Sequence, residues 1–504
     1  MRYLALLVLA LFTSLGIAQK EDYTWVIGHD YNINDDVHGR IELSFKTAPP
    51  SIEYLTGDVN MNMFISNTSI SDSSGNLIFY SNGCDIANDL GGILPNGDDI
   101  NPGFYHNRLC DEIRRGYSAG YPSMVILPLP ENDSIYYLFH NSVKYIPPPN
   151  EDAFVDRMLY STVKIASGKK SVLEKNIPII IDTLSTGGMG AVKHANGKDW
   201  WIIQSRDNSN QFYIFLFTKD GIVDTLLQTI GDIPPANQGL YGQTTFSSDG
   251  TRMIRFFPYT PIMNYTFDRF TGYFSNYSTF SVNYGSDFAD QGGCAISPSG
   301  QYLYISALLQ VYQFDLWATD ISSSQVKVAV WDGFTDPIAI SFLYCQPGPD
   351  CKIYIEGGGD TKYYHIIHNP DEAGLACNIE QRGLVFPIPS GASIPYFPNY
   401  RLGPIDNPGV PCSPVVATQQ PTVTTPRCSV WPNPASSQLN FEFSNNSIKR
   451  IRLSDAFGRT ARELNLSGTN NTCTISVSDL NSGVYIWQVE DSDSKVSVGK
   501  VLIH

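Results

Sequence analysis

A short pattern that recurs at intervals of 50 to 65 residues constrains this chain more than any other feature of its sequence. In each copy, a turn of Gly, Asp, Asn or Ser leads directly into a strand rich in aromatic and β-branched side chains, as in Ser71–Tyr80. Six copies occur, and their equivalent turn positions are Gly75, Asn132, Gly197, Gly250, Gly300 and Cys351. Since a four-stranded propeller blade takes roughly 40 to 50 residues, each copy is predicted to mark one blade.

The predicted fold class is all-β, with a six- or seven-bladed β-propeller followed by a small Ig-like β-sandwich. The 504 residues include 41 Gly and 32 Pro, and only 16% are charged, which favours short strands joined by tight turns. We expect the propeller to span residues 19–402, with residues 23–28 completing the last blade. An irregular stack of β-sandwiches is the alternative, because evenly spaced strands suit that architecture as well.

The repeat region resembles a known group of proteins. Residues 70–83 (Ile-Ser-Asp-Ser-Ser-Gly-Asn-Leu-Ile-Phe-Tyr-Ser-Asn-Gly) look like the first-blade signature of secreted Bacteroidetes β-propeller proteins, which are distantly related to WD40- and lactonase-type propellers. Further similar segments follow in the expected order, at residues 101–103, 116–117, 126–130, 192–201, 312–316 and 352–354. The resemblance covers residues 22–402 and implies a propeller fold without indicating a ligand.

The first 18 residues are predicted to be a signal peptide. Arg2 precedes an apolar run from Leu4 to Leu15, and Gly16-Ile17-Ala18 suits cleavage before Gln19. The run is too short to span a membrane, and no later stretch approaches the roughly 20 apolar residues that a span needs. We therefore expect an exported protein that passes through the periplasm and is not an integral membrane protein.

The C-terminal part is predicted to be a separate domain at residues 428–504, reached through a Pro-rich linker at residues 403–427. Five or more short alternating strands suggest a small β-sandwich there. Four landmarks resemble, in order, those of the type A C-terminal sorting domain of the type IX secretion system: Val430–Pro434, Asp455–Arg459, Leu480–Tyr485 and Lys500–Ile503.

This second resemblance implies how the protein is sorted. The implied signal residues are Pro432, Asn433, Pro434, Gly458, Gly483, Tyr485 and Lys500. The implied partners are the type IX secretion machinery and a surface sortase that removes the domain, after which the protein is released or attached to an anionic lipopolysaccharide on the outer cell surface. An accessory Ig-like domain that binds a ligand is the alternative, because such sandwiches host unrelated functions.

The formal net charge of −16 argues against nucleic acid as a partner, because binding to phosphates needs clustered Lys and Arg. Residues 428–504 contain seven basic and seven acidic side chains. The acidic excess therefore belongs to the signal peptide, propeller and linker.

No catalytic residue is assigned from the sequence. Residues 116–120 fit the Gly-x-Ser-x-Gly pattern around Ser118, but no alternation of strands and helices surrounds them, so a turn is the better interpretation. The sequence requires no cofactor; a divalent cation at the mouth of the propeller is the one to consider, with His194 and His140 the first residues to inspect. The acidic runs 34–36 and 97–99 offer oxygen ligands without the spacing of a calcium-binding EF-hand loop.

Nine cysteines in an exported chain favour some disulfides and leave at least one thiol unpaired. Cys345 and Cys351 flank a Gln-Pro-Gly-Pro-Asp turn and form the first-ranked pair; Cys84 with Cys110 is the second. The alternative for any of them is a buried free thiol that packs as a small apolar side chain.

The propeller is expected to bind an extracellular glycan or protein ligand without catalysis, because a rigid ring displays many loops and no catalytic constellation stands out. The alternative is a hydrolase or lyase with a site in the central funnel, with or without a metal. Three or more His, Asp, Glu or Asn side chains that converge in the funnel would favour the enzyme. A funnel lined by bulky apolar side chains would favour binding.

Overall fold

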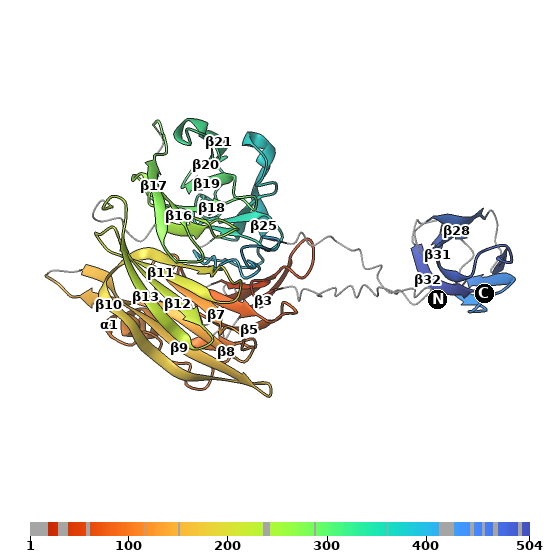
Figure 1. Cartoon of the computed structure of the whole chain (residues 1–504), viewed down its shortest axis with the longest axis horizontal. Coiled ribbons are helices and arrows are strands. Elements are labelled where there is room, and N and C mark those ends of the chain that lie inside the picture. The colour runs from red at the N-terminus through yellow and green to blue at the C-terminus, as the bar shows by residue number, and fades with distance from the viewer. Residues whose placement is uncertain are drawn as a thin grey trace, which may run out of the picture. The chain divides into compact units, whose positions relative to one another are not determined.

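The computed structural model describes residues 19–28, 39–56, 61–114, 116–149, 152–234, 242–286, 289–359, 361–412, 428–443, 448–455, 459–466, 472–491 and 496–504. The chain divides into two compact units, Met1–Val415 and Val416–His504, and both are built almost entirely of β-strands (Figure 1). Within the described residues, no helix is long and apolar enough to cross a membrane. The predicted signal peptide and residues 413–427 of the predicted linker lie outside the described residues.

The first unit begins with two three-stranded antiparallel sheets. The first sheet consists of β1 (Thr24–Ile27), β2 (Gly39–Ser44) and β3 (Ser51–Thr56). The second consists of β4 (Thr68–Ser71), β5 (Leu77–Ser81) and β6 (Ile86–Asn88). A long connection after β6 carries the helical turns α1 (Phe104–His106) and η1 (Asn107–Glu112).

A seven-stranded antiparallel sheet follows, and its central strand is shared by two halves. Its strands are β7 (Met124–Pro128), β8 (Ile135–Ile146), β9 (Asp152–Ala166), β10 (Lys169–Lys193), β11 (Trp200–Arg206), β12 (Gln211–Thr218) and β13 (Gly221–Thr229). The first part of β10 pairs with β9, and residues 189–193 pair with β11, with a break in register between Leu184 and Met189. Gly187 lies in this break with φ +62°, and a Cβ there would come within 2.6 Å of the Tyr121 carbonyl. The sheet therefore bends where only glycine fits.

Three four-stranded antiparallel sheets complete the first unit. They consist of β14 (Gln243–Phe246), β15 (Arg252–Phe256), β16 (Ile262–Phe267) and β17 (Phe274–Phe280); β18 (Gly292–Ile296), β19 (Tyr302–Ala307), β20 (Gln310–Asp315) and β21 (Val326–Val330); and β22 (Cys345–Pro347), β23 (Ile353–Glu356), β24 (Tyr363–Ile367) and β25 (Ile379–Val385). Two short 3-10 turns accompany them, at Ser322–Ser324 and Gly374–Cys377.

The six repeated turns that the sequence singles out all lie between consecutive paired strands. They join β4 to β5, β7 to β8, β10 to β11, β14 to β15, β18 to β19 and β22 to β23. Each turn includes a residue with positive φ, and at Gly75, Gly197, Gly250 and Gly300 this residue is glycine. The pattern was thus a signal of hairpins, because tight turns need left-handed backbone that glycine adopts without strain.

The first strands of the sheets lie beside one another in chain order. β1 lies next to β4 and β4 next to β7, and the same holds for β10 with β14, β14 with β18 and β18 with β22. The main apolar core includes buried side chains from the first, second, seven-stranded and last sheets. Further apolar clusters join the remaining sheets to their neighbours, so the inner strands of each sheet are buried while β13, β17 and β21 are largely exposed.

The first and last sheets meet through residues 390–402, an irregular segment after β25 that is called the closing segment below. The Gly28 N–H donates to Ser393 Oγ beside β1, and the Gln346 side chain in β22 donates to the Phe397 carbonyl. The prediction that residues 23–28 complete the last blade is corrected here, because β1 pairs with β2 in the first sheet. Pro395 and Pro398 lack the N–H groups of a regular ladder, so the closing segment bonds mainly through side chains.

Two disulfides are present among the described cysteines, Cys84–Cys110 and Cys351–Cys412. The predicted pair of Cys345 with Cys351 is wrong. Cys345 is a buried free thiol in β22, whereas Cys351 lies beyond Pro347 in the following turn, paired with a cysteine 61 residues along the chain. Cys294, Cys377 and Cys473 are also free thiols.

The second unit contains two antiparallel sheets around one core. One consists of β26 (Cys428–Trp431), β27 (Gln438–Phe443) and β30 (Thr472–Ser476); the other consists of β28 (Ile448–Asp455), β29 (Thr460–Asn465), β31 (Gly483–Asp491) and β32 (Val496–Ile503). Leu439 and Phe441 from the first sheet share the core with Ile451 and Trp487 from the second. The Phe441 and Trp487 rings meet edge to face, 6.1 Å apart.

Candidate functional site

Residues 390–402 pack between strands of several sheets of the first unit. Tyr400 in the closing segment donates a hydrogen bond to the Ile126 carbonyl in β7, over 2.6 Å, and the Ala191 N–H in β10 donates to Tyr396 Oη. Tyr121, just before β7, donates to Gln346 Oε1 in β22. Hydrogen bonds of these tyrosine hydroxyls therefore link segments that are far apart in the chain.

A small cavity of about 80 Å³ remains beside the closing segment. Its lining includes Gln243, Ser248, Gln346, Asn399 and the ion pair of Asp22 with Arg401. Both Asp22 oxygens accept hydrogen bonds from the Arg401 guanidinium, at 2.6 and 2.8 Å, so this carboxylate is already committed to a structural partner. The cavity offers room for water or a small group.

The two histidines chosen for inspection lie apart. His140 in β8 is fully buried, and its two ring nitrogens bond to Asn101 Oδ1 and Ser161 Oγ. Burial lowers the pKa of His140 to about 3, so the ring is neutral. His194 lies in the turn between β10 and β11, where its Nε2 is 3.2 Å from the Phe270 carbonyl. Within the described residues, no group of three His, Cys, Asp or Glu is arranged to hold a metal ion.

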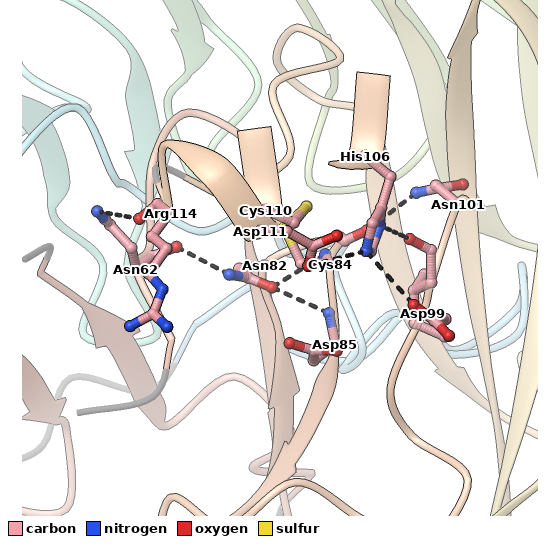
Figure 2. Close-up of a disulfide and its surroundings, with 12 residues drawn as sticks. Asn62, Asn82, Cys84, Asp85, Asp99, Asn101, His106, Cys110, Asp111 and Arg114 are labelled. Carbon is pink, nitrogen blue, oxygen red and sulfur yellow. Dashed lines mark hydrogen bonds and ion pairs between the residues drawn. A yellow bond between two sulfur atoms is a disulfide. The ribbon is translucent and has the colours of Figure 1, made fainter. Parts of the chain in front are cut away.

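A cluster of polar side chains lies around the Cys84–Cys110 disulfide (Figure 2). The buried ring of His106 in α1 bonds through Nδ1 to the Ile100 carbonyl. Its Nε2 lies 3.7 Å from Asp99 and 3.9 Å from Asp111, both of which are exposed. The disulfide ties the β5–β6 connection to η1, and this fixes His106 among the carboxylates. The acidic run at residues 97–99 and the predicted pair of Cys84 with Cys110 were the sequence signals for this cluster, and the run at residues 34–36 lies outside the described residues.

Asp85 is the carboxyl of this cluster whose pKa is shifted most. Burial raises the pKa of Asp85 to about 6, even though the nearby His106 favours its ionised form. Asn82 Oδ1 accepts the Cys84 and Asp85 N–H groups, so the loop that carries Asp85 has a fixed shape (Figure 2). A carboxyl that titrates near pH 6 beside a histidine is able to exchange protons under physiological conditions.

The Gly-x-Ser-x-Gly segment takes a structural role. Gly116 and Gly120 have φ of +86° and +87°, and Ser118 is buried with its carbonyl bonded to Tyr105 Oη. Both glycines have left-handed backbone, which glycine adopts without strain.

An open groove of about 540 Å³ lies between the two halves of the seven-stranded sheet. Tyr137 in β8, Tyr160 in β9 and residues 177–180 in β10 form one wall, and Tyr213 in β12 with Ile222 in β13 contributes to the other. The innermost part of this interface is closed by Phe139 against Phe217, with ring centroids 5.3 Å apart. Farther out the strands diverge, and the three tyrosines remain half-buried. No sequence signal marks this groove, because its tyrosines are far apart in the chain and come together only in the folded sheet.

The predicted sorting residues gather around the last strand of the second unit. Asn433 holds β32 through two bonds: its side-chain amide donates to the Lys500 carbonyl, and its oxygen accepts from the Leu502 N–H at 2.9 Å. Gly483 and Tyr485 in β31 are paired with Ile503 and Val501. Pro432 and Pro434 flank Asn433, and Gly458 lies outside the described residues.

Known proteins match this chain in different ways in its two units. Residues 429–504 match the secretion system C-terminal sorting domain. No curated protein matches the sequence.

Similar solved structures include a putative 6-phosphogluconolactonase from Bacteroides fragilis, with 13% identity over 73% of this chain and 97% of that one, at a TM-score of 0.41. The Swd1 β-propeller domain from Myceliophthora thermophila is 10% identical over 67% of this chain and 91% of that one, at a TM-score of 0.38. The extracellular domain of a putative hybrid two-component system from Bacteroides thetaiotaomicron is 12% identical over 96% of this chain and 56% of that one, at a TM-score of 0.32.

The match at residues 429–504 agrees with the landmarks that the sequence shows and with their position around β32. The all-β first unit is thus the cargo of a type IX C-terminal sorting domain, and the chain is a protein that is secreted or attached to the outer cell surface.

Proposed function

We propose that this protein is an exported seven-bladed β-propeller that binds an extracellular glycan or protein without catalysis, and that its Ig-like C-terminal sandwich directs the export. The observation that supports the proposal is the packing around residues 390–402. The hydroxyls of Tyr121, Tyr396 and Tyr400 and the Gln346 side chain are bonded to one another and to backbone, and the cavity beside them measures only about 80 Å³.

The bend in β10 supports a count of seven blades. It divides the seven-stranded sheet into two four-stranded meanders that share one strand, so that the six sheets of the first unit contain seven meanders in chain order. The neighbouring first strands support a radial arrangement, and the closing segment joins the first meander to the last. A ring of this kind is rigid and displays its loops and outer strands for binding.

A binding screen with the full-length chain tests this proposal. The probes are an array of plant, fungal and bacterial polysaccharides and an array of extracellular bacterial proteins, each with and without calcium and magnesium. We expect saturable binding to a ligand on one of the arrays, with no release of reducing sugar or peptide during incubation. A chain that binds neither array would contradict the proposal.

A hydrolase or lyase is the second candidate, and the cluster of polar side chains in Figure 2 is the observation that favours it. Asp85, with its raised pKa, and the neighbouring His106 are the residue types that acid and base catalysis requires. Release of new reducing ends from a bound polysaccharide, abolished by Asp85→Asn, would establish this candidate in place of the first. If the Asp85→Asn variant retained this cleavage activity, the cluster in Figure 2 would be excluded as the active site.

A further inference from the structure

We propose that the groove between the two halves of the seven-stranded sheet binds a neutral glycan chain through its tyrosine rings. This inference rests on the proposed binding function and names the site and ligand class. The groove is the feature of the first unit that combines size, half-buried aromatic rings and a polar rim. It is lined by residues of β8, β9, β10, β12 and β13, away from the closing segment.

The shape of the groove follows from the bend in β10. The two halves of the sheet are in contact where Phe139 meets Phe217, and the groove is lined by residues of both halves. The β12–β13 hairpin turns at Gly221, whose φ is +87°, and brings Asp220 into the lining of the groove. The resulting volume of about 540 Å³ is within the size that small-molecule and oligosaccharide sites need.

The aromatic rings in the groove suit the apolar faces of sugar rings. Tyr137 and Tyr160 are inclined to one another at 37°, with centroids 5.2 Å apart, and both remain partly exposed. Burial raises the pKa of Tyr160, and the Glu174 carboxylate adds to the effect, so its hydroxyl stays protonated and able to donate. An aromatic face supplies apolar contact area, while the hydroxyl at its edge bonds to a polar ligand group.

The opposite wall adds a fixed polar edge. Tyr213 Oη donates to Asp182 Oδ2 over 2.7 Å, and the same carboxylate accepts from Arg206 Nε at 2.9 Å. These bonds hold the Tyr213 ring in place. Leu227, directly opposite Tyr213 on β13, is 56% exposed and continues the apolar strip. Alternation of apolar and polar surface is what a sugar chain, with C–H faces and equatorial hydroxyls, requires.

The charges around the groove select against acidic polysaccharides. Glu174, Asp220 and Asp224 are exposed on its strands and turn, whereas Arg206 is paired with Asp182 and Lys219 lies 3.4 Å from Asp220. The first unit also carries the acidic excess of the whole chain. The residues that line the groove include Asp220 and no Lys or Arg, so an anionic chain would meet repulsion inside it. A neutral glycan meets no such cost, and the carboxylates are able to accept its hydroxyl protons.

The test measures binding of the full-length chain to immobilised mannan, xyloglucan, soluble starch and chitin, with polygalacturonate as the anionic counterpart. We expect at least one neutral polysaccharide to bind and polygalacturonate not to bind. Tyr160→Ala should weaken this binding about tenfold, because it removes one stacking ring, while Tyr160→Phe should keep most of the affinity. Tyr54→Ala is the control, since Tyr54 is an exposed strand tyrosine on β3, outside the groove.

The possible results separate the site from the function. If a neutral glycan binds and Tyr160→Ala leaves its affinity unchanged while thermal unfolding shows a folded variant, the groove is not the site and the binding function stands. Preference for polygalacturonate, or for an extracellular protein at the groove, would overturn the ligand class. Absence of binding to every polysaccharide and to the protein array would overturn the proposed function as well.

Discussion

Gly250 and Gly300 hold equivalent positions in two repeated turns, with φ of +72° and +80°. A Cβ at Gly250 would lie 2.6 Å from Val192 and 2.9 Å from Leu402, whereas nothing lies within 4 Å of one at Gly300. We expect Gly300→Ala to lower the free energy of unfolding by about 1 kcal/mol, the cost of left-handed backbone. Gly250→Ala should cost roughly 2 to 4 kcal/mol, because overpacking adds to that strain. Chemical denaturation measures both, and equal losses would contradict a rigid contact at Val192 and Leu402.

His140 gives the first unit a defined acid sensitivity. The folded protein holds the ring neutral, with a pKa of about 3 because of burial, whereas histidine in an unfolded chain titrates near 6.5. Below pH 6.5 the unfolded chain therefore binds a proton that the folded one excludes. The stability contributed by neutral His140 is complete above pH 6.5 and is lost toward pH 3, by about 1.4 kcal/mol per pH unit. Denaturation of His140→Gln at several pH values should give a flatter dependence than the parent chain; parallel curves would contradict this.

The cysteines show what residue-level reasoning is able to predict. Cys84 and Cys110 were a predicted pair, and the disulfide joins them across one local excursion of 26 residues. Cys351 was assigned to Cys345 because a turn separates them, but β22 buries Cys345 and leaves Cys351 beyond its end. Its partner Cys412 lies in the segment expected to be linker. Only the tertiary path of residues 390–412 brings those two sulfur atoms together.

At the level of elements, the hairpin turns were predictable from the sequence. That the single strand β10 would pair with both halves of the seven-stranded sheet was not. The six turns appeared in the sequence because glycine and its polar neighbours determine the hairpin directly. The 25-residue strand β10 carries no sign of its double role, since its register break depends on Gly187 approaching the Tyr121 carbonyl. The groove depends on that break. Its tyrosines were therefore visible only as ordinary strand residues.

The Cys351–Cys412 disulfide is expected to stabilise the closing segment. It closes a loop of 61 residues that contains residues 390–402, and Arg401 also donates to the Pro411 carbonyl. Replacing both cysteines by serine should lower the free energy of unfolding by about 2 to 4 kcal/mol, because the unfolded chain regains the freedom of that loop. Cys473→Ser, which removes a free thiol in the other unit, is the control and should leave the unfolding of the first unit unchanged. A double variant as stable as the parent chain would show that the side-chain bonds alone hold the segment.

On the scale of the whole molecule, charge and contacts divide the chain in the same way. Residues 428–504 balance seven basic against seven acidic residues, and the rest of the chain carries the excess of −16. The sorting landmarks were recognisable because they are short and local, and the family match covers the same residues. The ligand could not be recognised from the sequence, since binding surfaces are formed by residues that are distant in the chain. Export and ligand binding are therefore expected to be separable by mutation.

The last strand of the second unit provides the sharpest test of that separation. Asn433→Ala removes both side-chain bonds to β32, so the amount of protein that reaches the medium or the cell surface should fall, with the remainder in the periplasm. Ser436→Ala changes an exposed neighbour and should be exported normally. Deletion of residues 428–504 should retain all of the protein in the periplasm, while its thermal unfolding there matches that of the first unit in the full chain, because the two units are separate. Fractionation with quantitative immunoblotting measures the distribution, and continued appearance of the deletion variant in the medium would contradict the role of the domain.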